Sequence, residues 1–309
     1  MERNKMNQNR NGLFLAASAF FLVVIAACSA PKTLSYSNPA QREEISWELV
    51  FQQAGKVELT HLITGEVLPN RKDLINLSNS ESSKYPTGDV WLKNVTLLLR
   101  HESKGDFLIN TGYDASYSTN AHGKIGGLMA NRTWKARQNP GNDLVSLLKE
   151  HQAKPHTIFL ENWNPDHTAS IPNLPKDITY ISGAGERYLN VPLLFHAPFL
   201  KGLSPIRQID FSTAKKVDKL GPVIDILGDQ SIWAISAPGF TKGQLAFLIV
   251  SKHGPVLYTG EAITTKFQFQ HGVEAGRVAD REQAIQSLQM LRNFVKKYPQ
   301  VKVIYGKEI

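Results

Sequence analysis

The sequence predicts a mixed α/β domain with a layered architecture. Apolar residues make up 42% of the 309 residues and charged residues 20%, an ordinary globular composition that can bury a core. Strand-like and helix-like segments alternate along most of the chain. From Trp47 onward no second linker interrupts this pattern, so we expect a single folded domain over residues 46–309.

The first half of this domain is expected to be rich in strands. A short helix is expected before the last of them, because Asn142 or Asp143 can cap a turn that carries Leu144, Leu147 and Leu148. The predicted strands are 57–62, 90–100, 107–110 and 156–160, with a turn at 103–106.

The second half continues the alternation. Asp280 is followed three residues later by Gln283, which is typical of a helix start. Pro299 ends this helix. The apolar face of the helix is expected to hold Ala284, Leu288, Leu291 and Val295. The predicted strands are 178–182, 223–227, 231–237, 244–250, 255–259 and 301–305.

The N-terminal segment has the composition of a secretory signal. Residues 1–10 carry three basic residues and one acidic residue, and residues 13–27 are apolar or small. This run is shorter than the roughly 20 residues that a membrane span needs. The only cysteine of the chain, Cys28, ends Ile-Ala-Ala-Cys and resembles a bacterial lipobox. The resemblance implies removal of residues 1–27 and lipidation of Cys28; a plain signal peptide or a buried apolar helix is the alternative.

The remaining polar features indicate a tethered envelope protein. Residues 28–45 are rich in Ser, Pro and polar residues, as a flexible tether would be. Ser29 follows the cysteine, and in Gram-negative lipoproteins this implies the outer membrane, facing the periplasm. The net charge of +8 falls to about +6 without the leader and is spread along the chain. This distribution favours contact with an anionic membrane surface over nucleic-acid binding.

Several common catalytic motifs are absent from the sequence. It contains no GxSxG nucleophile elbow, no P-loop and no HExxH zinc motif. The glycines at 183 and 185 lack the third glycine of a dinucleotide fingerprint, so we expect a turn there. A single cysteine excludes a disulfide framework and a Cys-based zinc finger.

Five loops, each placed just after a predicted strand, carry the strongest functional signal. They are residues 108–112 (LINTG), 159–167 (FLENWNPDH), 237–243 (APGFTKG), 258–262 (YTGEA) and 304–307 (IYGK). In order and spacing they resemble the metallo-β-lactamase superfamily, whose loops read LIDTG, HxHxDH, PGHTxG and TGDA before a strand ending in GH. Residues 228–234, 254–260 and 271–276 are similar to a secreted, lactonase-like hydrolase branch. The resemblance implies an αββα sandwich with a dinuclear metal site at one sheet edge.

Most of the metal ligands that this resemblance implies are replaced. Asp166 and His167 match, Asp166 being also the candidate catalytic residue, and Glu261 replaces the bridging aspartate conservatively. The positions of four ligand histidines are occupied by Asn162, Asn164, Phe240 and Lys307. Asn110 likewise replaces the aspartate of LIDTG.

These replacements argue against a complete zinc centre. A phenyl ring donates nothing to a metal, an amide oxygen is a weak neutral donor, and a lysine ammonium has no acceptor. Zinc binding by four ligands is worth roughly 10–16 kcal/mol, so each lost ligand costs on the order of 3 kcal/mol. Without the metal, nothing lowers the pKa of an attacking water to about 7. We therefore expect no metal or one weakly bound divalent ion, and no dinuclear zinc site.

Lys307 suggests what replaces the metal. The resemblance implies that its ammonium projects toward the carboxylates of Asp166 and Glu261, which would repel each other without a cation. Trp163, His196 and His271 are further candidates for lining the pocket. The simpler interpretation of these three is packing for Trp163, a satisfied half-buried histidine for His196 and a solvated loop for His271.

Two functions remain open at this point. The first is a lipid-anchored, non-catalytic member of the superfamily that binds a small molecule or a periplasmic protein. The second is a metal-dependent hydrolase of a lactone or ester that uses one ion on Asp166, His167 and Glu261. Because that set is rich in oxygen donors, it would suit a harder cation than zinc.

Overall fold

The computed structural model describes residues 31–41, 44–188, 190, 193–203, 205–212 and 214–308. The expected leader, 1–27, and the expected lipidation site, Cys28, lie outside these residues. Within the described part of the chain, no helix is both long and apolar enough to cross a membrane.

The strands form two groups that meet at one pair of residues. The first group runs in the order β1-β8-β7-β6-β4-β3-β2 and the second in the order β12-β11-β10-β9, with β13 and β14 beyond β12 and β5 beside β2. In the part of the chain that the structure describes, one parallel pair of strand residues, Ser251 and Val57, joins them. The bounds of the strands are β1 Thr33–Ser35, β2 Val57–Leu68, β3 Leu92–His101, β4 Gly105–Ile109, β5 Lys135–Arg137, β6 Pro155–Leu160, β7 Thr179–Gly183, β8 Ile206–Ile209, β9 Lys215–Val217, β10 Gly221–Asp225, β11 Ile232–Ser236, β12 Leu245–Ser251, β13 Gly254–Tyr258 and β14 Lys302–Ile304.

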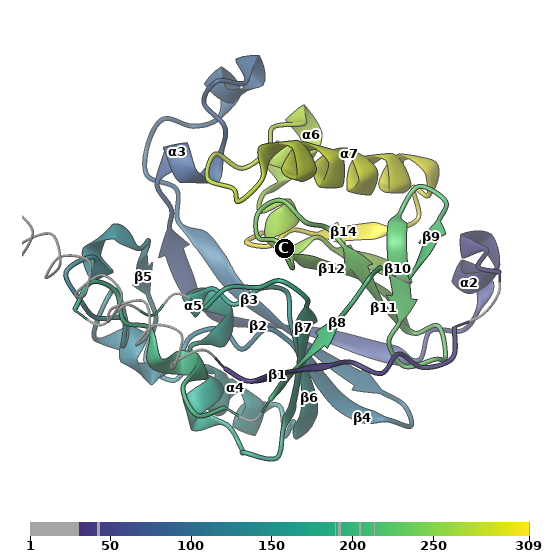
Figure 1. Cartoon of the computed structure of the whole chain (residues 1–309), viewed down its shortest axis with the longest axis horizontal. Helices are drawn as coiled ribbons and strands as arrows, with labels where there is room; N and C mark the ends of the chain where they lie inside the picture. The colour runs from purple at the N-terminus through teal and green to yellow at the C-terminus, as the bar shows by residue number, and fades with distance from the viewer. Residues whose placement is uncertain are drawn as a thin grey trace, which may run out of the picture.

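Helices cover the outer faces of both groups (Figure 1). The longest helix of the described chain, α7, begins after Asp280. The Asp280 carboxylate accepts one hydrogen bond from the backbone N–H of Gln283 and another from the Gln283 side-chain amide, the latter at 2.9 Å. This is the start that the sequence predicts. The α-helices are α2 Trp47–Gln52, α3 Arg71–Leu74, α4 Leu144–Glu150, α5 Pro165–Thr168, α6 Lys266–His271 and α7 Arg281–Lys297.

Alternation along the strands divides the core into three apolar layers. In β12, Leu245, Phe247 and Ile249 face the layer between the two sheets. The intervening residues Ala246, Leu248 and Val250 face α7 and α2. A third layer packs α4 and Leu200 on the outer face of the first group. Helix, sheet, sheet and helix therefore stack in the αββα order, and β12 reads as continuously apolar because both of its faces are buried.

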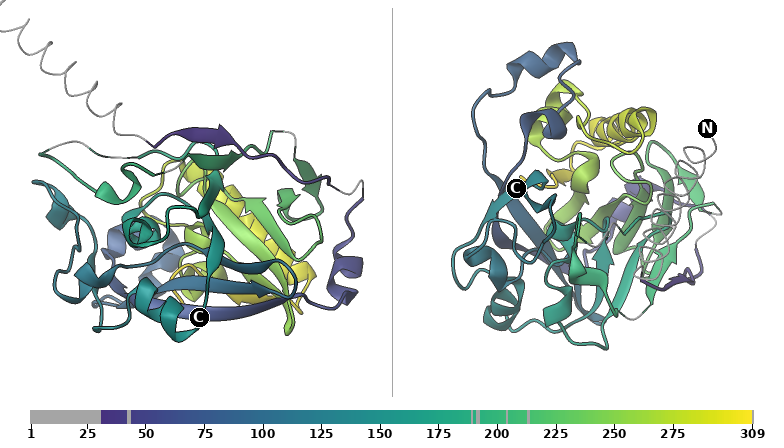
Figure 2. Two further views of the ribbon diagram at one scale, coloured as in Figure 1. Left: turned by 90° about the horizontal axis from the view of Figure 1, so that it is seen from below. Right: turned by 60° about the vertical axis from the view of Figure 1, so that its left-hand side comes forward.

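The segment expected to be a flexible tether contributes to the fold. Residues Thr33–Ser35 form β1, which pairs in parallel with β8 and lies at the periphery in the left-hand view of Figure 2. Tyr36 donates to the carbonyl of Ile226 at 3.0 Å, and the side chain of Gln41 donates to the carbonyl of Asp225 at 3.1 Å. This part of the segment is therefore ordered, whereas its composition suggests a freely flexible tether. Composition does not reveal long-range strand pairing.

Candidate functional site

The five loops singled out in the sequence converge at one edge of the sandwich. The loop after β4 supplies Asn110, which adopts a positive φ of 67°, a conformation that asparagine tolerates. The loop after β6 supplies residues 161–167 and leads into α5. Glu261 lies in a single 3₁₀ turn after β13, and Lys307 follows β14. The C-terminal ends of several strands meet here, and this places residues that are distant in the sequence in one cluster.

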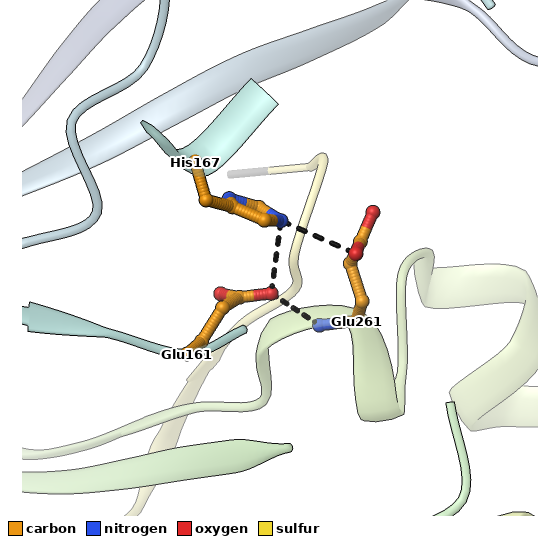
Figure 3. Close-up of side chains that lie close together, drawn as sticks. All are labelled: Glu161, His167 and Glu261. Atoms are coloured by element: carbon orange, nitrogen blue, oxygen red, sulfur yellow. Dashed lines mark hydrogen bonds and ion pairs between the residues drawn. The ribbon is translucent and has the colours of Figure 1, made fainter. Parts of the chain in front are cut away.

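The centre of the cluster is formed by Glu161, His167 and Glu261 (Figure 3). The Nε2 atom of His167 lies 3.3 Å from Oε1 of Glu161 and 3.2 Å from Oε2 of Glu261. All three side chains are at most 1% exposed. Neither ring nitrogen of His167 makes a directed hydrogen bond with any described residue, so the contacts are electrostatic. These three residues could hold a metal ion.

Glu161 is a site residue that the sequence reasoning missed. Its Oε2 accepts from the Tyr258 hydroxyl at 2.6 Å and from the Asn110 amide at 2.9 Å. Its Oε1 accepts from the backbone N–H of Glu261 at 2.9 Å. The available signal was an acidic residue directly after an apolar strand, since a buried carboxylate needs several donors.

Lys307 pairs with Asp166 in the interior. The ammonium of Lys307 forms an ion pair with Oδ2 of Asp166 and donates to Oδ1 of Asn94 at 2.9 Å. The Lys307 side chain is fully buried, whereas that of Asp166 keeps 15% exposure. Asn94, on β3, also donates to the backbone carbonyl of Asp166 at 3.1 Å. The structure thus places the Lys307 ammonium against a carboxylate of the cluster, namely that of Asp166.

Two asparagines aim donors at Glu261. The side-chain amides of Asn162 and Asn164 donate to Oε2 of Glu261 at 2.9 and 3.1 Å. The NH₂ group must be the atom facing the carboxylate, because a carboxylate only accepts. Asn162 also donates to Oε1 of Gln244 at 2.9 Å. The positive ends of two amide dipoles therefore occupy the positions where the resemblance implies ligand histidines.

Positively and negatively charged side chains face each other in the cluster. Burial would lower the pKa of His167, but the carboxylates of Asp166 and Glu161 raise it to about 9. Burial would raise the pKa of Asp166, but His167 and Lys307 lower it to about 2. Burial also opposes the charge on Lys307, and Asp166 and Glu261 nevertheless raise its pKa above the ordinary value. At neutral pH two side-chain cations therefore face the acidic groups.

A further, half-buried acid lies near His167 of this cluster. Glu186 accepts from the backbone N–H groups of Gly243 at 3.0 Å and Trp163 at 3.2 Å, and from the hydroxyl of Thr241. Burial raises the pKa of Glu186 to about 7, although these hydrogen bonds oppose the rise. Glu186 thus joins the loop after β7 to the loop after β11.

A cavity of about 640 Å³ opens over the cluster. Asn164, Asp166 and Glu261 lie at its polar end. Three exposed arginines also line it, and their guanidinium groups make no hydrogen bond or ion pair with a described residue: Arg132, Arg187 and Arg277. Eight aromatic side chains contribute to its wall, namely Tyr113, Tyr117, Trp134, Trp163, Tyr188, Phe195, Phe199 and Phe240.

The three further candidates for the pocket separate into two groups. Trp163 lines the cavity and is only 7% exposed. Contrary to expectation, His196 and His271 do not line it. Each is engaged elsewhere: His196 contacts Asn190 Oδ1 at 3.0 Å, and His271 contacts Glu81 Oε2 at 3.0 Å.

Comparisons with known proteins bear on the fold. No family model and no curated protein matches the sequence. Among solved structures, B. thuringiensis AiiA with N-decanoyl-L-homoserine at its active site aligns with a TM-score of 0.61 and 20% identity, over 83% of this chain and 95% of that one. The dizinc quorum-quenching lactonase AidC aligns with a TM-score of 0.56 and 16% identity, over 83% and 89%. A hydrolase described as belonging to the β-lactamase superfamily gives 0.53 and 15%, over 81% and 87%. The predicted αββα metallo-β-lactamase fold is therefore confirmed.

The two-metal centre that this fold implies does not fit the residues present. Amide NH₂ groups and a phenyl ring stand at the first metal position, and an ammonium stands at the second. A single ion is geometrically compatible with Glu161, His167 and Glu261. Their contacts of 3.2 and 3.3 Å match the roughly 3.3 Å between neighbouring ligands of a four-coordinate ion with bonds of about 2.0–2.1 Å. Such an ion must displace the proton on His167, because only neutral imidazole ligates.

Proposed function

We propose that this chain is a lipid-anchored binding protein that uses the metallo-β-lactamase fold without hydrolysis. The observation that carries this proposal is the buried ion pair between Lys307 and Asp166. An ammonium at this position supplies positive charge to the carboxylates. It offers no vacant coordination position to a water or a carbonyl, which metal-assisted hydrolysis requires.

The amide groups next to the ion pair support the same conclusion. Asn162 and Asn164 satisfy the Glu261 carboxylate with hydrogen bonds at 2.9 and 3.1 Å. A carboxylate that already accepts these donors and faces His167 gains little from a metal. The cluster is therefore stable without a metal, and it closes the polar end of the cavity.

The cavity indicates the class of ligand. Its wall is rich in aromatic side chains, and its volume of about 640 Å³ lies in the range of small-molecule sites. Arg132, Arg187 and Arg277 bring three unpaired positive charges to the same cavity. A small amphipathic anion, with an apolar body against the aromatic residues and an acidic group near the guanidinium groups, has the matching chemistry.

The location belongs to the proposal as well. The leader and Cys28 favour lipidation and the outer membrane of a bacterial envelope, facing the periplasm. In that place a periplasmic protein is the other candidate partner, and no basic block indicates nucleic acid.

Metal content is the decisive test. The full chain is purified in detergent without chelators or a histidine tag, and elemental analysis follows incubation with zinc, manganese, iron or calcium. We expect less than about a tenth of an equivalent of each ion. Near-stoichiometric metal that disappears in His167→Gln, but persists in His196→Gln as a matched control outside the cavity, contradicts the proposal.

The spacing around His167 favours one alternative, a hydrolase with a single metal. Glu161, His167 and Glu261 would hold the ion, and the oxygen-rich set suits a harder cation than zinc. The AiiA and AidC structures carry lactone hydrolysis products, so lactones and related esters are the substrates to screen. Metal-dependent turnover that is lost in His167→Gln supports this alternative.

A further inference from the structure

Two segments far apart in the sequence form a paired tip beside the cavity. The backbone N–H of Leu128 donates to the carbonyl of Leu193 at 2.9 Å, and that of Met129 donates to Leu194 at 2.8 Å. Gly126 and His196 exchange two further bonds of 2.8 Å. The four side chains Leu128, Met129, Leu193 and Leu194 are called the apolar tip below.

The apolar tip is unusually exposed. Leu128 is 83% exposed and Leu193 is 82% exposed, and both are more exposed than any other large apolar residue reported for the described chain. Single exposed leucines are ordinary, but these two project from adjacent, hydrogen-bonded segments. A folded protein gains nothing from such side chains in water, so the tip is expected to be covered in the working state.

Leu193 also has a costly backbone conformation. Its φ is +69°, in the left-handed region that favours glycine and asparagine. Neither core packing nor turn geometry calls for leucine at this position, because its side chain lies in solvent. Strain of this kind at an exposed residue points to a role other than stability.

The two segments that carry the tip contain basic residues and no acidic ones. Residues 121–135 and 187–203 contain no acidic residue and carry Lys124, Lys135 and Lys201 as well as two of the cavity arginines. Lys124 is engaged by Asp114. Lys135 and Lys201 are exposed and have no ion pair with a described residue. Apolar side chains surrounded by positive charge complement an anionic lipid surface.

The start of the described chain lies near the same region. The carbonyl of Lys32 accepts from the N–H of Ile206 at 2.9 Å, so β1 begins beside the residues that lead from the tip into β8. Lys32 is four positions after Cys28, which is a span of at most about 14 Å. An anchor at the N-terminal segment would therefore hold this side of the domain close to the bilayer.

We propose that the apolar tip and its basic flanks form a membrane-contact surface that docks on anionic phospholipid headgroups. Leu128 and Leu193 enter the interface, while Lys135, Lys201 and Arg132 face the phosphates. This contact belongs to the folded domain and goes beyond the proposed anchor and the proposed binding function. Because Met129, Leu194, Arg132 and Arg187 also line the cavity, docking orients the cavity toward the lipid surface.

Hydrogen–deuterium exchange on the full chain tests the proposal. The protein is compared in vesicles of phosphatidylcholine with 30% phosphatidylglycerol, in pure phosphatidylcholine vesicles and in detergent micelles. We expect peptides covering 124–130 and 193–200 to exchange about fivefold slower in the anionic vesicles than in the other two media. Peptides around Leu49, another exposed leucine, should not change between media.

The variants separate docking from folding. Leu128→Asn with Leu193→Asn should abolish the slower exchange and leave exchange in β12 unchanged, because asparagine tolerates the φ of +69° at position 193. Leu49→Asn, the matched control, should retain the slower exchange. Equal exchange in all three media overturns the proposal. Protection that instead increases with protein concentration in detergent also overturns it, since it indicates contact between copies or with another protein.

Discussion

The ammonium of Lys307 contacts the carboxylate of Asp166 inside the cluster where the loop motifs imply metal ligands. Lys307 is fully buried and has, among the described residues, one other side-chain acceptor, Asn94. A lysine in place of a metal keeps a positive charge against the carboxylate and removes the vacant coordination position. We therefore expect the pair to stabilise the domain, and this contribution can be measured by unfolding.

Lys307→Met should destabilise the protein clearly. Removal of one partner from a buried ion pair leaves an uncompensated charge and costs about 3–5 kcal/mol. Because Asp166 keeps 15% exposure, the lower end of this range is expected, with a fall in Tm of roughly 6–10 °C. Thermal unfolding measured in the presence of EDTA checks the value.

Two controls accompany this measurement. Lys302→Met changes an exposed lysine of the same terminal segment and should be nearly neutral. The double variant Lys307→Met with Asp166→Asn should recover part of the loss, since neither charge remains. If Lys307→Met unfolds at the wild-type temperature, the cation is not needed and the role proposed for Lys307 is wrong.

Gly112→Ala should cost more than an ordinary glycine replacement. Gly112 has a φ of +55°, and an added Cβ would lie 2.3 Å from Oγ1 of Thr64 and 2.8 Å from Oγ1 of Thr96. Backbone strain and displacement of these buried residues should together cost about 3 kcal/mol or more in denaturant unfolding. Gly141, with a φ of +87° and open space around it, is the matched control. Gly141→Ala should cost only about 1–2 kcal/mol, and equal losses would show that the close approach is unimportant.

Glu186 should make stability depend on pH. Its pKa is about 7 in the folded protein, above the ordinary value of 4.5. Between pH 4.5 and 7 the folded state therefore keeps a proton on Glu186 that the unfolded state has released. The stabilisation is complete below about pH 4.5 and is lost as the pH rises through 7, with a total change of about 3 kcal/mol. Unfolding free energies of wild type and Glu186→Gln, measured from pH 4.5 to 8, should differ by an amount that varies over this window. A constant difference contradicts the raised pKa.

The cavity arginines should select charge in a ligand. Anilinonaphthalene sulfonate, an apolar anion, should bind the wild type more tightly than Arg187→Gln with Arg277→Gln, by roughly three- to tenfold at low salt. The neutral dye N-phenyl-1-naphthylamine should bind both equally. Lys296→Gln removes an exposed charge on α7, away from the cavity, and should affect neither dye. Equal loss of both dyes would indicate damage to the pocket rather than loss of charge recognition.

Much of the fold could be predicted from local patterns. The strands β10 to β13 and the helix α7 appear within about two residues of their expected bounds, because each has strong apolar periodicity or a capping signal. The short strands β1, β5, β8 and β9 were missed. They have four residues or fewer, and their pairing partners lie far away in the sequence or have no local signal.

The site was predictable only where loop motifs carried it. Asp166, His167, Glu261 and Lys307 meet as the loop order implies. Glu161 escaped notice because its partners, Tyr258 and Asn110, come from other strands and no spacing rule connects them. The sequence does not decide whether His196 and His271 reach the cavity, and the three-dimensional path of their loops places both outside it.

The short strand β1 has a consequence for how the protein behaves outside its native setting. It is the last strand of its group, and its three residues cover the free edge of β8. A shortened form that begins after Ser35 would leave the edge of β8 open to pairing with another chain, which is a common start of aggregation. The N-terminal segment thus protects a sheet edge as well as connecting the domain to the leader. Protein expressed with this segment should be more soluble than the shortened form.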